Sequence, residues 1–252
     1  MVSIVMPAYN EAEIIEAAVR EWYGEVVAKL PGSELIVVDD CSTDGTGEAL
    51  AALERELPAL RAVRPPRNGG HGKALRFGFR HAARDLIFQT DSDRQHLPED
   101  FWKLWERRDR CDFVFGVRGS RRDGAFRVLV TRTMRLLNFA MWGEWIRDAN
   151  CPFKLMRRRA LETVLEKVPA DSFIPMVMVS IVARKLGFRF EEVTVAHLPR
   201  TGGQQSLKGM MKWARVGRRC FSQLLRLRLS MRPSAALPAH SAAQRRRDAE
   251  TG

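Results

Sequence analysis

The most telling stretch of the sequence reads Leu86-Ile87-Phe88-Gln89-Thr90-Asp91-Ser92-Asp93-Arg94-Gln95-His96. A short apolar run ahead of a polar cluster predicts a buried strand that ends in a loop. In an extended segment, Asp91 and Asp93 place their carboxylate oxygens around one hard cation, and Gln95 can add a third oxygen from the same side. Mg²⁺ or Mn²⁺ takes oxygen ligands of this kind and keeps open positions for substrate phosphates. A solvated turn is the alternative, and it is the commoner explanation of an isolated Asp-x-Asp pair.

The first segment of the chain follows the same order of strand, polar loop and helix. Val2–Met6 is an apolar run that should stop at Pro7, because proline cannot continue a central ladder. Asn10 is suited to cap a helix whose apolar residues recur at helical spacing from Ile14 to Leu30.

A further strand and acidic loop come next. Glu34–Val38 is predicted as the strand, Asp39 and Asp40 follow it, and a helix is predicted over Thr46–Leu57. Acids at the carboxyl end of a strand suit the nucleotide crevice of an open α/β sheet, because they accept hydrogen bonds from a base or a ribose. Helix capping is the alternative, and it accounts for residues 42–44 better than for the two acids. The alternation of strands and helices predicts an α/β domain with a mostly parallel sheet covered on both faces.

Four motifs, taken in order, resemble glycosyltransferase family 2, the nucleotide-sugar transferases with the GT-A fold. They are PAYNE at 7–11, VDDCSTDGT at 38–46, NGGHGKAL at 68–75 and DSDRQH at 91–96. Their spacing fits the family across about the first two-thirds of the chain. The second loop of the family usually reads Asp-Asp-Gly-Ser, so Cys41 is a departure that leaves both acids in place. The resemblance implies a GT-A (Rossmann-like), mostly parallel twisted sheet flanked by helices.

The resemblance also implies roles for the residues of these motifs. A divalent ion, Mg²⁺ or Mn²⁺, would bridge the donor diphosphate on Asp91, Asp93 and Gln95, and this Asp-x-Asp-x-Gln form resembles the polyprenyl-phosphate, dolichol-phosphate mannose synthase-like branch. The glycine-rich loop 68–73 opens a helix and would offer backbone N–H groups and a lysine to anionic groups, although a flexible turn explains its glycines equally well. The residues implied to bind the nucleotide-sugar are Pro7, Ala8, Tyr9, Glu11, Asp39, Asp40, Lys73, Asp91 and Ser92.

The second half of the chain should hold the acceptor. Residues 112–117 are predicted as a strand, residues 127–145 as an amphipathic helix, and residues 191–196 as another strand. The same branch carries a similar Gly-x-Arg…Arg-x-Asp element, in which arginines meet the phosphate of the donor or of a lipid acceptor; arginine suits that bidentate contact. The candidates here are Arg118, Arg121 and Arg127, and a solvated basic loop explains them almost as well.

Some of these residues are also candidate catalytic groups. The loop with His197 and Arg200 resembles one that closes over the diphosphate, where positive charge would offset the charge of the leaving group; a structural histidine at a strand end is the alternative. The candidate catalytic set is Asp93, Arg118, Asp148, His197 and Arg200. A phosphate acceptor is already anionic and needs no strong base, whereas an alcohol would need one, with Asp148 or Asp123 as first candidates.

Charge and hydropathy place limits on the setting. The chain has 252 residues and a net charge of +12, and it carries four cysteines without metal-like spacing, which favours a reducing cytosol. We expect no N-terminal signal, because the first strand begins at once. No run approaches the roughly 18 apolar residues that a membrane span needs; the longest candidate, Ser172–Ala183, is far too short.

A basic amphipathic helix is predicted near the C-terminus. No Asp or Glu occurs between Glu192 and Asp248, and residues 206–229 place a narrow basic stripe beside a wide apolar arc. Such a helix suits the surface of anionic lipid, and packing on the catalytic domain is the alternative. Arg218 and Arg228 interrupt the apolar arc, which favours lipid phosphates over a dry core. The residues of the basic stripe are Lys208, Lys212, Arg215, Arg219, Gln223 and Arg226.

These expectations give one domain organisation and one leading function. Residues 1–205 are predicted to form the catalytic domain, with a nucleotide-sugar half (1–96) and an acceptor half (97–205). Residues 206–230 are predicted to form the amphipathic helix, and residues 231–252 a tail of disordered composition.

The predicted function is inverting, metal-dependent transfer of a hexose from a UDP- or GDP-sugar to polyprenyl phosphate, at the inner face of the cell membrane. The alternative is the same donor chemistry onto a glycolipid, a natural product or a soluble sugar. Nucleic-acid binding is disfavoured, because the basic residues lie beside Met, Trp and Leu; the oligomeric state is left open.

Overall fold

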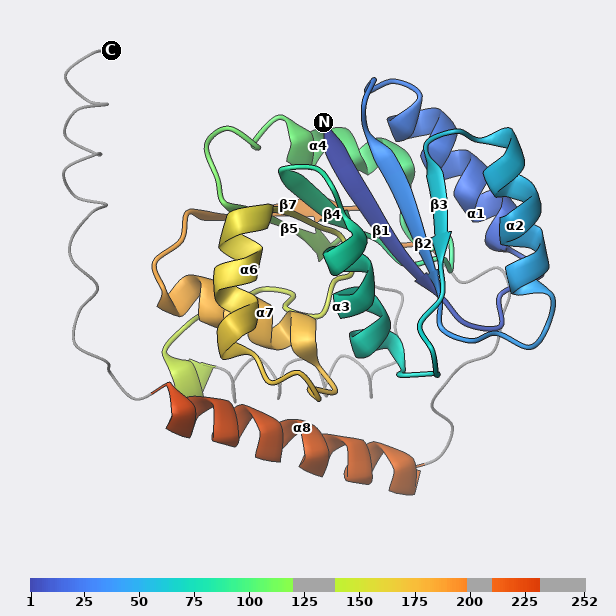
Figure 1. Cartoon of the computed structure of the whole chain (residues 1–252). Coiled ribbons are helices and arrows are strands. Elements are labelled where there is room, and N and C mark those ends of the chain that lie inside the picture. Colours follow the sequence, from blue (N-terminus) through green and yellow to red (C-terminus); the bar gives the residue numbers. More distant parts are fainter. Residues whose placement is uncertain (120–138, 199–209, 232–252) are drawn as a thin grey trace, which may run out of the picture.

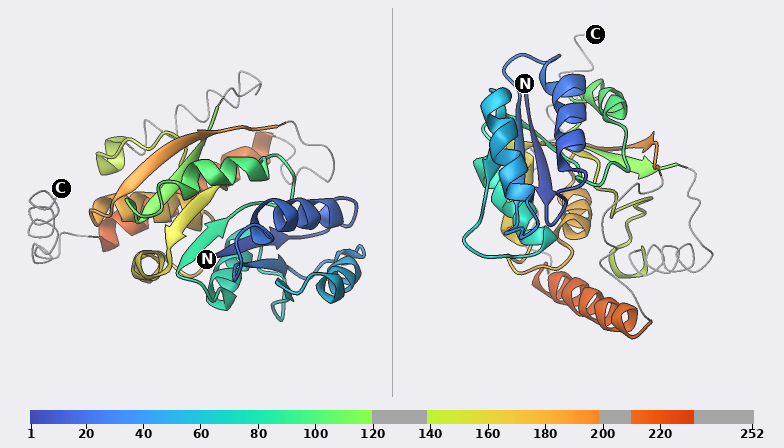
Figure 2. Two further views of the ribbon diagram at one scale, coloured as in Figure 1. Left: turned by 90° about the horizontal axis from the view of Figure 1, so that it is seen from above. Right: turned by 90° about the vertical axis from the view of Figure 1, so that its right-hand side faces the viewer.

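The computed structural model describes residues 1–119, 139–198 and 210–231, which form a seven-stranded sheet with helices on both faces (Figures 1 and 2). The strand order is β3-β2-β1-β4-β6-β5-β7, and β6 runs antiparallel to β4 and β5 while the other neighbours are parallel. The bounds are β1 Val2–Ala8, β2 Glu34–Asp39, β3 Leu60–Val63, β4 Leu86–Gln89, β5 Phe113–Arg118, β6 Lys154–Arg157 and β7 Phe190–Val195. The predicted α/β class and mostly parallel sheet are confirmed.

Helices fill the connections between the strands. Their bounds are α1 Ile15–Trp22 with the π-helical extension η1 Tyr23–Val27, α2 Thr46–Glu56, α3 His71–His81, the 3₁₀ turn η2 Pro98–Asp100, α4 Phe101–Trp105, α6 Arg158–Lys167, α7 Pro175–Lys185 and α8 Met210–Ser230.

The side chains of the central strands alternate between two cores, as the period of two along a strand requires. Val5 and Ile36 lie in the core shared with α3, α6 and α7. Ile4 and Leu35, one residue earlier in each strand, lie in the core shared with α1, α2 and α4. Helix α3 packs closely on β1 because Gly78 has no Cβ; one placed there would lie 2.4 Å from Cγ1 of Val5.

The first strand is longer than the sequence indicated, because β1 continues through Pro7 to Ala8. The backbone O of Val5 accepts from Thr90 N on the β4 side, and that of Ala8 accepts from Asp40 N on the β2 side. Alternation therefore points the nitrogen of Pro7 toward β4, beyond the last paired residue of that ladder, Gln89. No ladder hydrogen bond is lost, so the proline is tolerated in a central strand.

The predicted cap of the first helix is wrong. The helix begins at Ile15, and Asn10 adopts a left-handed φ of 53° several residues earlier. The side-chain Oδ1 of Asn10 instead accepts a hydrogen bond from Thr43 N in the loop after β2 (2.9 Å). A contact between two loops has therefore replaced local capping.

The predicted helix 127–145 lies mostly outside the described residues. In its described part, residues 139–142 are helical and the helix ends three residues earlier than predicted. Gly143 has a φ of 68°, and its N donates to Phe139 O (2.7 Å). A glycine in this left-handed conformation closes a helix, which explains the earlier end.

Helix α8 lies along one side of the molecule, on the side toward which the arrow of β1 points in Figure 1. Leu224 and Leu227 are buried in the core with α7, so part of the predicted apolar arc packs on the domain. Phe221, Leu225 and Leu229 follow one another at helical spacing and are exposed by 46%, 41% and 59%. The predicted packing of the helix on the domain is therefore present, and an apolar row on the same helix is left exposed. No described helix is long and apolar enough to cross a membrane.

Candidate functional site

The loops after β1 and β2 are tied into one unit at the carboxyl ends of these neighbouring strands. Asn10 N donates to Ser42 Oγ (3.0 Å), and Glu11 N donates to Thr46 Oγ1 (3.0 Å). Pro7 and Ala8 end β1, and Tyr9 is half exposed beside them. The first two predicted donor-binding motifs therefore meet, as their positions at strand ends require.

The loop after β2 contains the departure from the family pattern. Cys41 has a φ of 64°, a left-handed conformation that glycine adopts without strain. The Sγ of Cys41 lies 3.3 Å from Pro65 O and N of Ser42 donates to Asp39 Oδ1 (2.8 Å), so neighbouring contacts hold the turn. The strained φ explains why glycine is usual at this position.

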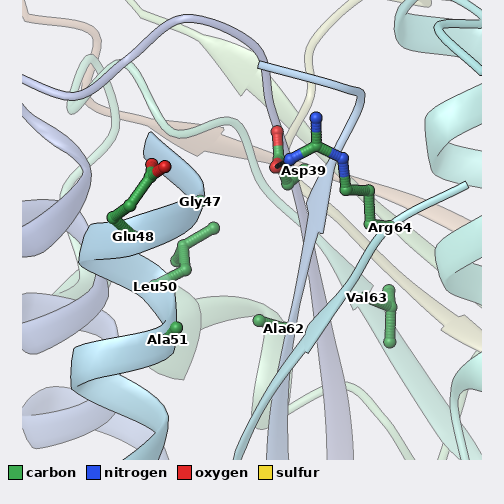
Figure 3. Close-up of a pocket in the computed structure, with 8 residues that line it drawn as sticks. All are labelled: Asp39, Gly47, Glu48, Leu50, Ala51, Ala62, Val63 and Arg64. Carbon is green, nitrogen blue, oxygen red and sulfur yellow. Dashed lines mark hydrogen bonds and ion pairs between the residues drawn. The ribbon is translucent and has the colours of Figure 1, made fainter. Parts of the chain in front are cut away.

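The two acids of this loop have different partners. Asp39 is buried, and its Oδ2 lies 2.9 Å from Nη1 of Arg64, whose side chain is half exposed. The pair stands at one end of a hollow of about 320 Å³ between α2 and β3 (Figure 3). The hollow is lined by Asp39, Gly47, Glu48, Leu50, Ala51, Ala62, Val63 and Arg64. This is a recess beside a carboxylate and a guanidinium, groups that can recognise the edge of a base.

Asp40 holds the glycine-rich loop. Its Oδ1 accepts from Gly69 N (2.9 Å) and its Oδ2 from Gly70 N (2.7 Å), while its backbone O accepts from Nδ2 of Asn68 (2.8 Å). The sequence suggested that the N–H groups of the 68–73 loop face a bound anion; those of Gly69 and Gly70 instead donate to Asp40. The loop is thereby fixed against β2, and Lys73 remains as its exposed cationic group.

The glycine-rich loop also approaches the acidic loop after β4. Nε2 of His71, the first residue of α3, lies 3.8 Å from Oδ1 of Asp91. Asp93 Oδ1 accepts from Gln95 N (3.1 Å), and Ser92 is buried between the two acids. Arg94, between Asp93 and Gln95, adopts a φ of 55°.

The donor set of this loop fits a hard divalent cation. Asp91, Asp93 and Gln95 supply two carboxylates and an amide, all oxygen donors of the kind Mg²⁺ and Mn²⁺ prefer. Nε2 of Gln95 donates to Leu198 O (3.0 Å), which leaves its Oε1 as the atom able to ligate. Within residues 1–119, 139–198 and 210–231, no cluster of three or more His, Cys, Asp or Glu side chains is placed to hold a metal; the candidate site depends on the amide.

The predicted acceptor half contributes a buried ion pair at the carboxyl end of β5. The guanidinium of Arg118 binds Asp148 through Nε to Oδ2 (2.8 Å) and Nη2 to Oδ1 (2.9 Å). The two side chains are only 15% and 4% exposed. Because both carboxylate oxygens accept from one guanidinium, Asp148 is suited to orient Arg118 and poorly suited to act as a base. Arg121 and Arg127, the other candidate phosphate contacts, and Asp123 lie outside the described residues.

A group that the sequence reasoning missed lies beside this pair. Lys154, the first residue of β6, is fully buried; its Nζ donates to Ala149 O (3.1 Å) and lies 4.0 Å from the centre of the Phe115 ring. Burial lowers the pKa of Lys154 to about 8, and it raises the pKa of the nearby Cys151 thiol to about 11. A lysine inside the apolar run Phe153–Met156 was the available signal, since an unpaired charge there is costly.

Two histidines connect the acidic loop to β7. The ring of His96 is buried 5.4 Å from that of His197, with its Nδ1 3.2 Å from Ala196 O. Burial, followed by His197 and Arg118, lowers the pKa of His96 to about 4, so it is neutral at pH 7. Leu198 N donates to Gln95 O (2.8 Å), so the predicted His197 loop does reach the acidic loop. Arg200 lies outside the described residues.

Sequence comparison identifies the family and gives similar proteins. The model of Glycosyl transferase family 2 matches residues 3–165. An undecaprenyl-phosphate 4-deoxy-4-formamido-L-arabinose transferase of Salmonella paratyphi A is 30% identical over 211 residues, 83% of this chain and 63% of the relative. A protein of the same name in Pseudomonas aeruginosa is 32% identical over 212 residues, 83% of this chain and 61% of the relative. The chain therefore spans less than two-thirds of these relatives.

Solved structures support the fold. A mannosyltransferase of Pyrobaculum calidifontis, in complex with GDP-Man and Mn²⁺, superposes with a TM-score of 0.64 at 23% identity, covering 94% of this chain and 66% of that one. Glucosyl-3-phosphoglycerate synthase of Mycobacterium tuberculosis, in complex with Mn²⁺, UDP and phosphoglyceric acid, gives a TM-score of 0.67 at 20% identity, covering 96% and 84%. At such identities the likeness concerns the fold, which is that of the GT-A glycosyltransferases.

Proposed function

The chain belongs to glycosyl transferase family 2, and we propose that it moves a hexose from a UDP- or GDP-linked sugar to polyprenyl phosphate, with inversion at the anomeric carbon. The observation that carries the donor half is the meeting of three polar loops at the carboxyl ends of β1, β2 and β4, neighbours in the sheet. Ligands of open α/β sheets bind in this position. The complexes of the two structural neighbours contain a GDP-sugar and UDP, respectively, which supports a nucleotide-sugar donor.

In the donor half, each loop has a distinct task. Asp39, with Arg64 beside it, faces the hollow and would contact the base or ribose. Asp40 keeps the glycine-rich loop in place, so that Lys73 can meet the donor diphosphate. A divalent cation on Asp91, Asp93 and Gln95 would neutralise charge on the leaving diphosphate.

In the acceptor half, the Arg118–Asp148 pair favours a phosphate acceptor. An alcohol would have to give its proton to a base, and both oxygens of the first candidate, Asp148, accept from Arg118. A phosphate oxygen is already anionic, and it can attack the anomeric carbon as the bond to the diphosphate breaks. Arg118 would attract that phosphate with its guanidinium charge, in the orientation that the pair with Asp148 sets. The names of the two bacterial relatives, which specify undecaprenyl phosphate, support this acceptor.

A lipid acceptor requires contact with a membrane, and α8 is the element suited to it. The exposed row Phe221, Leu225 and Leu229 would enter the interface, with the exposed Arg218 and Arg226 against anionic headgroups. Helix α8 lies on the side toward which the arrow of β1 points (Figure 1), so the lipid and the donor would meet from the same side. We therefore propose peripheral binding at the inner face of the cell membrane.

The test is a donor screen with and without lipid. Purified protein is given UDP- and GDP-sugars with Mg²⁺ or Mn²⁺, with and without polyprenyl phosphate, and release of nucleoside diphosphate is measured. Asp93→Ala should abolish release, and Asp109→Ala, an exposed acid between α4 and β5, should leave it unchanged. Nucleoside diphosphate release that needs both the metal and the lipid phosphate supports the proposal. If release occurs only with water-soluble sugars as acceptors, the proposed acceptor is wrong. If no nucleotide-sugar binds, the proposed function is refuted.

A further inference from the structure

A fully buried amine lies under the junction of the donor and acceptor halves. Because β6 runs antiparallel to its neighbours, its first residue, Lys154, lies at the edge where β4 and β5 end. It pairs with Gln89, two residues before Asp91, and with Phe115, three residues before Arg118. Its side chain has no exposed surface. The ammonium is therefore central to the site although no substrate can touch it.

The contacts of Lys154 lead to Arg118 through one turn. Its Nζ donates to Ala149 O (3.1 Å), an oxygen that also faces Ser180 Oγ (3.4 Å). Residue 149 follows Asp148, whose carboxylate accepts two hydrogen bonds from the guanidinium of Arg118. Cys151 N donates to Asp148 O (3.2 Å), which closes the turn. Lys154 thus holds the turn whose carboxylate orients Arg118.

The free-energy cost of burying this ammonium indicates that the lysine has a role other than stabilising the fold. An ammonium taken out of water loses its hydration, and a ring face with one carbonyl restores only part of it. The charged groups near Lys154 are Asp148 and Glu192 in its favour and Arg118 against it; the Cys151 thiol, whose pKa is raised to about 11, is neutral at pH 7. Asp148 is already bound to Arg118, so its attraction for Lys154 is shared. A methionine of similar length would fill the same space without this loss.

We propose that Lys154 is a positioning residue, whose ammonium fixes the 148–151 turn and so holds Arg118 ready for the phosphate of the acceptor. The inference rests on the proposed function for the identity of that phosphate. Lys154 itself takes no part in bond making, because its side chain has no exposed surface that a substrate could reach. Its removal should therefore affect the acceptor and leave the donor nucleotide unaffected.

The experiment compares Lys154→Met with Ser180→Ala, which removes the other donor near Ala149 O without changing charge. Hydrogen exchange of the peptide 144–153 reports the turn directly and needs no substrate. Kinetics with polyprenyl phosphate at saturating donor, together with calorimetric binding of the nucleoside diphosphate, separate acceptor from donor effects. Lys154→Arg, which keeps a charge and a donor, serves as the rescue variant.

We expect Lys154→Met to melt no lower than the wild type, to exchange faster over 144–153, and to raise the acceptor KM about tenfold, equivalent to about 1.4 kcal/mol. The Kd of the nucleoside diphosphate should be unchanged, Ser180→Ala should show a smaller effect, and Lys154→Arg should restore the acceptor KM. Exchange and acceptor KM like those of the wild type would overturn the proposal. So would a Lys154→Met protein that does not fold, because the lysine would then be structural. If the wild type transfers no sugar to polyprenyl phosphate, the proposed function fails, and the exchange measurement still decides the role of Lys154 in the turn.

Discussion

Asp40→Asn separates support of the glycine-rich loop from direct binding of the donor. The two carboxylate oxygens of Asp40 accept from Gly69 N and Gly70 N at 2.9 and 2.7 Å. An asparagine keeps one acceptor and turns an NH₂ group toward the other N–H. A hydrogen bond to a charged group contributes about 1.5–3 kcal/mol. Asp40→Asn removes one of the two bonds, and the acceptor of the bond that remains is no longer charged. Because the loop is partly exposed, water can replace part of the loss, and we expect destabilisation of about 2 kcal/mol.

For a chain of this length, 2 kcal/mol corresponds to a fall in Tm of about 4–8 °C. The assay is thermal unfolding followed by circular dichroism, with Glu162→Gln as the control, since it makes the same change from carboxylate to amide on an exposed side chain of α6, away from the hollow. Nucleoside diphosphate binding is measured on the same samples below the transition. A Tm unchanged within about 1 °C together with lost nucleotide affinity would refute the reasoning, because Asp40 would then contact the donor and not hold the loop.

Three further outcomes follow from the structure. Arg64→Met should weaken nucleoside diphosphate binding, measured by calorimetry, about tenfold. It should change the free energy of unfolding by less than about 1 kcal/mol, since the pair with Asp39 is partly exposed. An unchanged Kd would show that the hollow is not part of the donor site. Leu225→Glu should reduce co-sedimentation with anionic vesicles about tenfold or more at an unchanged Tm. Thr163→Glu on α6 is the charge-matched control. Equal vesicle binding of the two variants would contradict membrane contact through α8. The pKa of Lys154 is lowered to about 8 in the folded protein, so the unfolded chain binds more protons between about pH 8 and 10.5. The free energy of unfolding of the wild type should therefore rise by about 3 kcal/mol relative to Lys154→Met across that range. If urea unfolding gives the same difference at every pH in the range, burial does not lower the pKa of Lys154 and the reasoning is wrong.

The parts of the fold that the sequence predicted are those specified locally. The strands that end at Asp39 and Gln89 were found because an apolar run and the polar residues that stop it are adjacent in the chain. The meeting of these strand ends then follows from the geometry of a parallel sheet. Family resemblance added the motif order, which no periodicity could give.

The parts that the sequence did not predict depend on partners far along the chain. Asp40 lies 29 residues from Gly69, and Arg118 lies 30 from Asp148. Nothing in the residues near Asp40 indicates that its carboxylate accepts from a loop and not from a ribose. The strand β6 is only four residues long and begins with a lysine, so neither length nor alternation identified it.

The direction of β6 explains why basic and acidic groups meet at this site. A parallel strand between β4 and β5 would bring its carboxyl end, and so its following loop, to the crevice. An antiparallel strand brings its first residue and the turn before it, here Lys154 and the 148–151 turn. That turn supplies Asp148, which holds the guanidinium of Arg118 on β5, while β4 leads into the acidic loop with Asp91 and Asp93. In the described sheet, the reversed strand β6 therefore allows anionic and cationic groups to lie at neighbouring strand ends, as the proposed transfer from a nucleoside diphosphate to a phosphate would require.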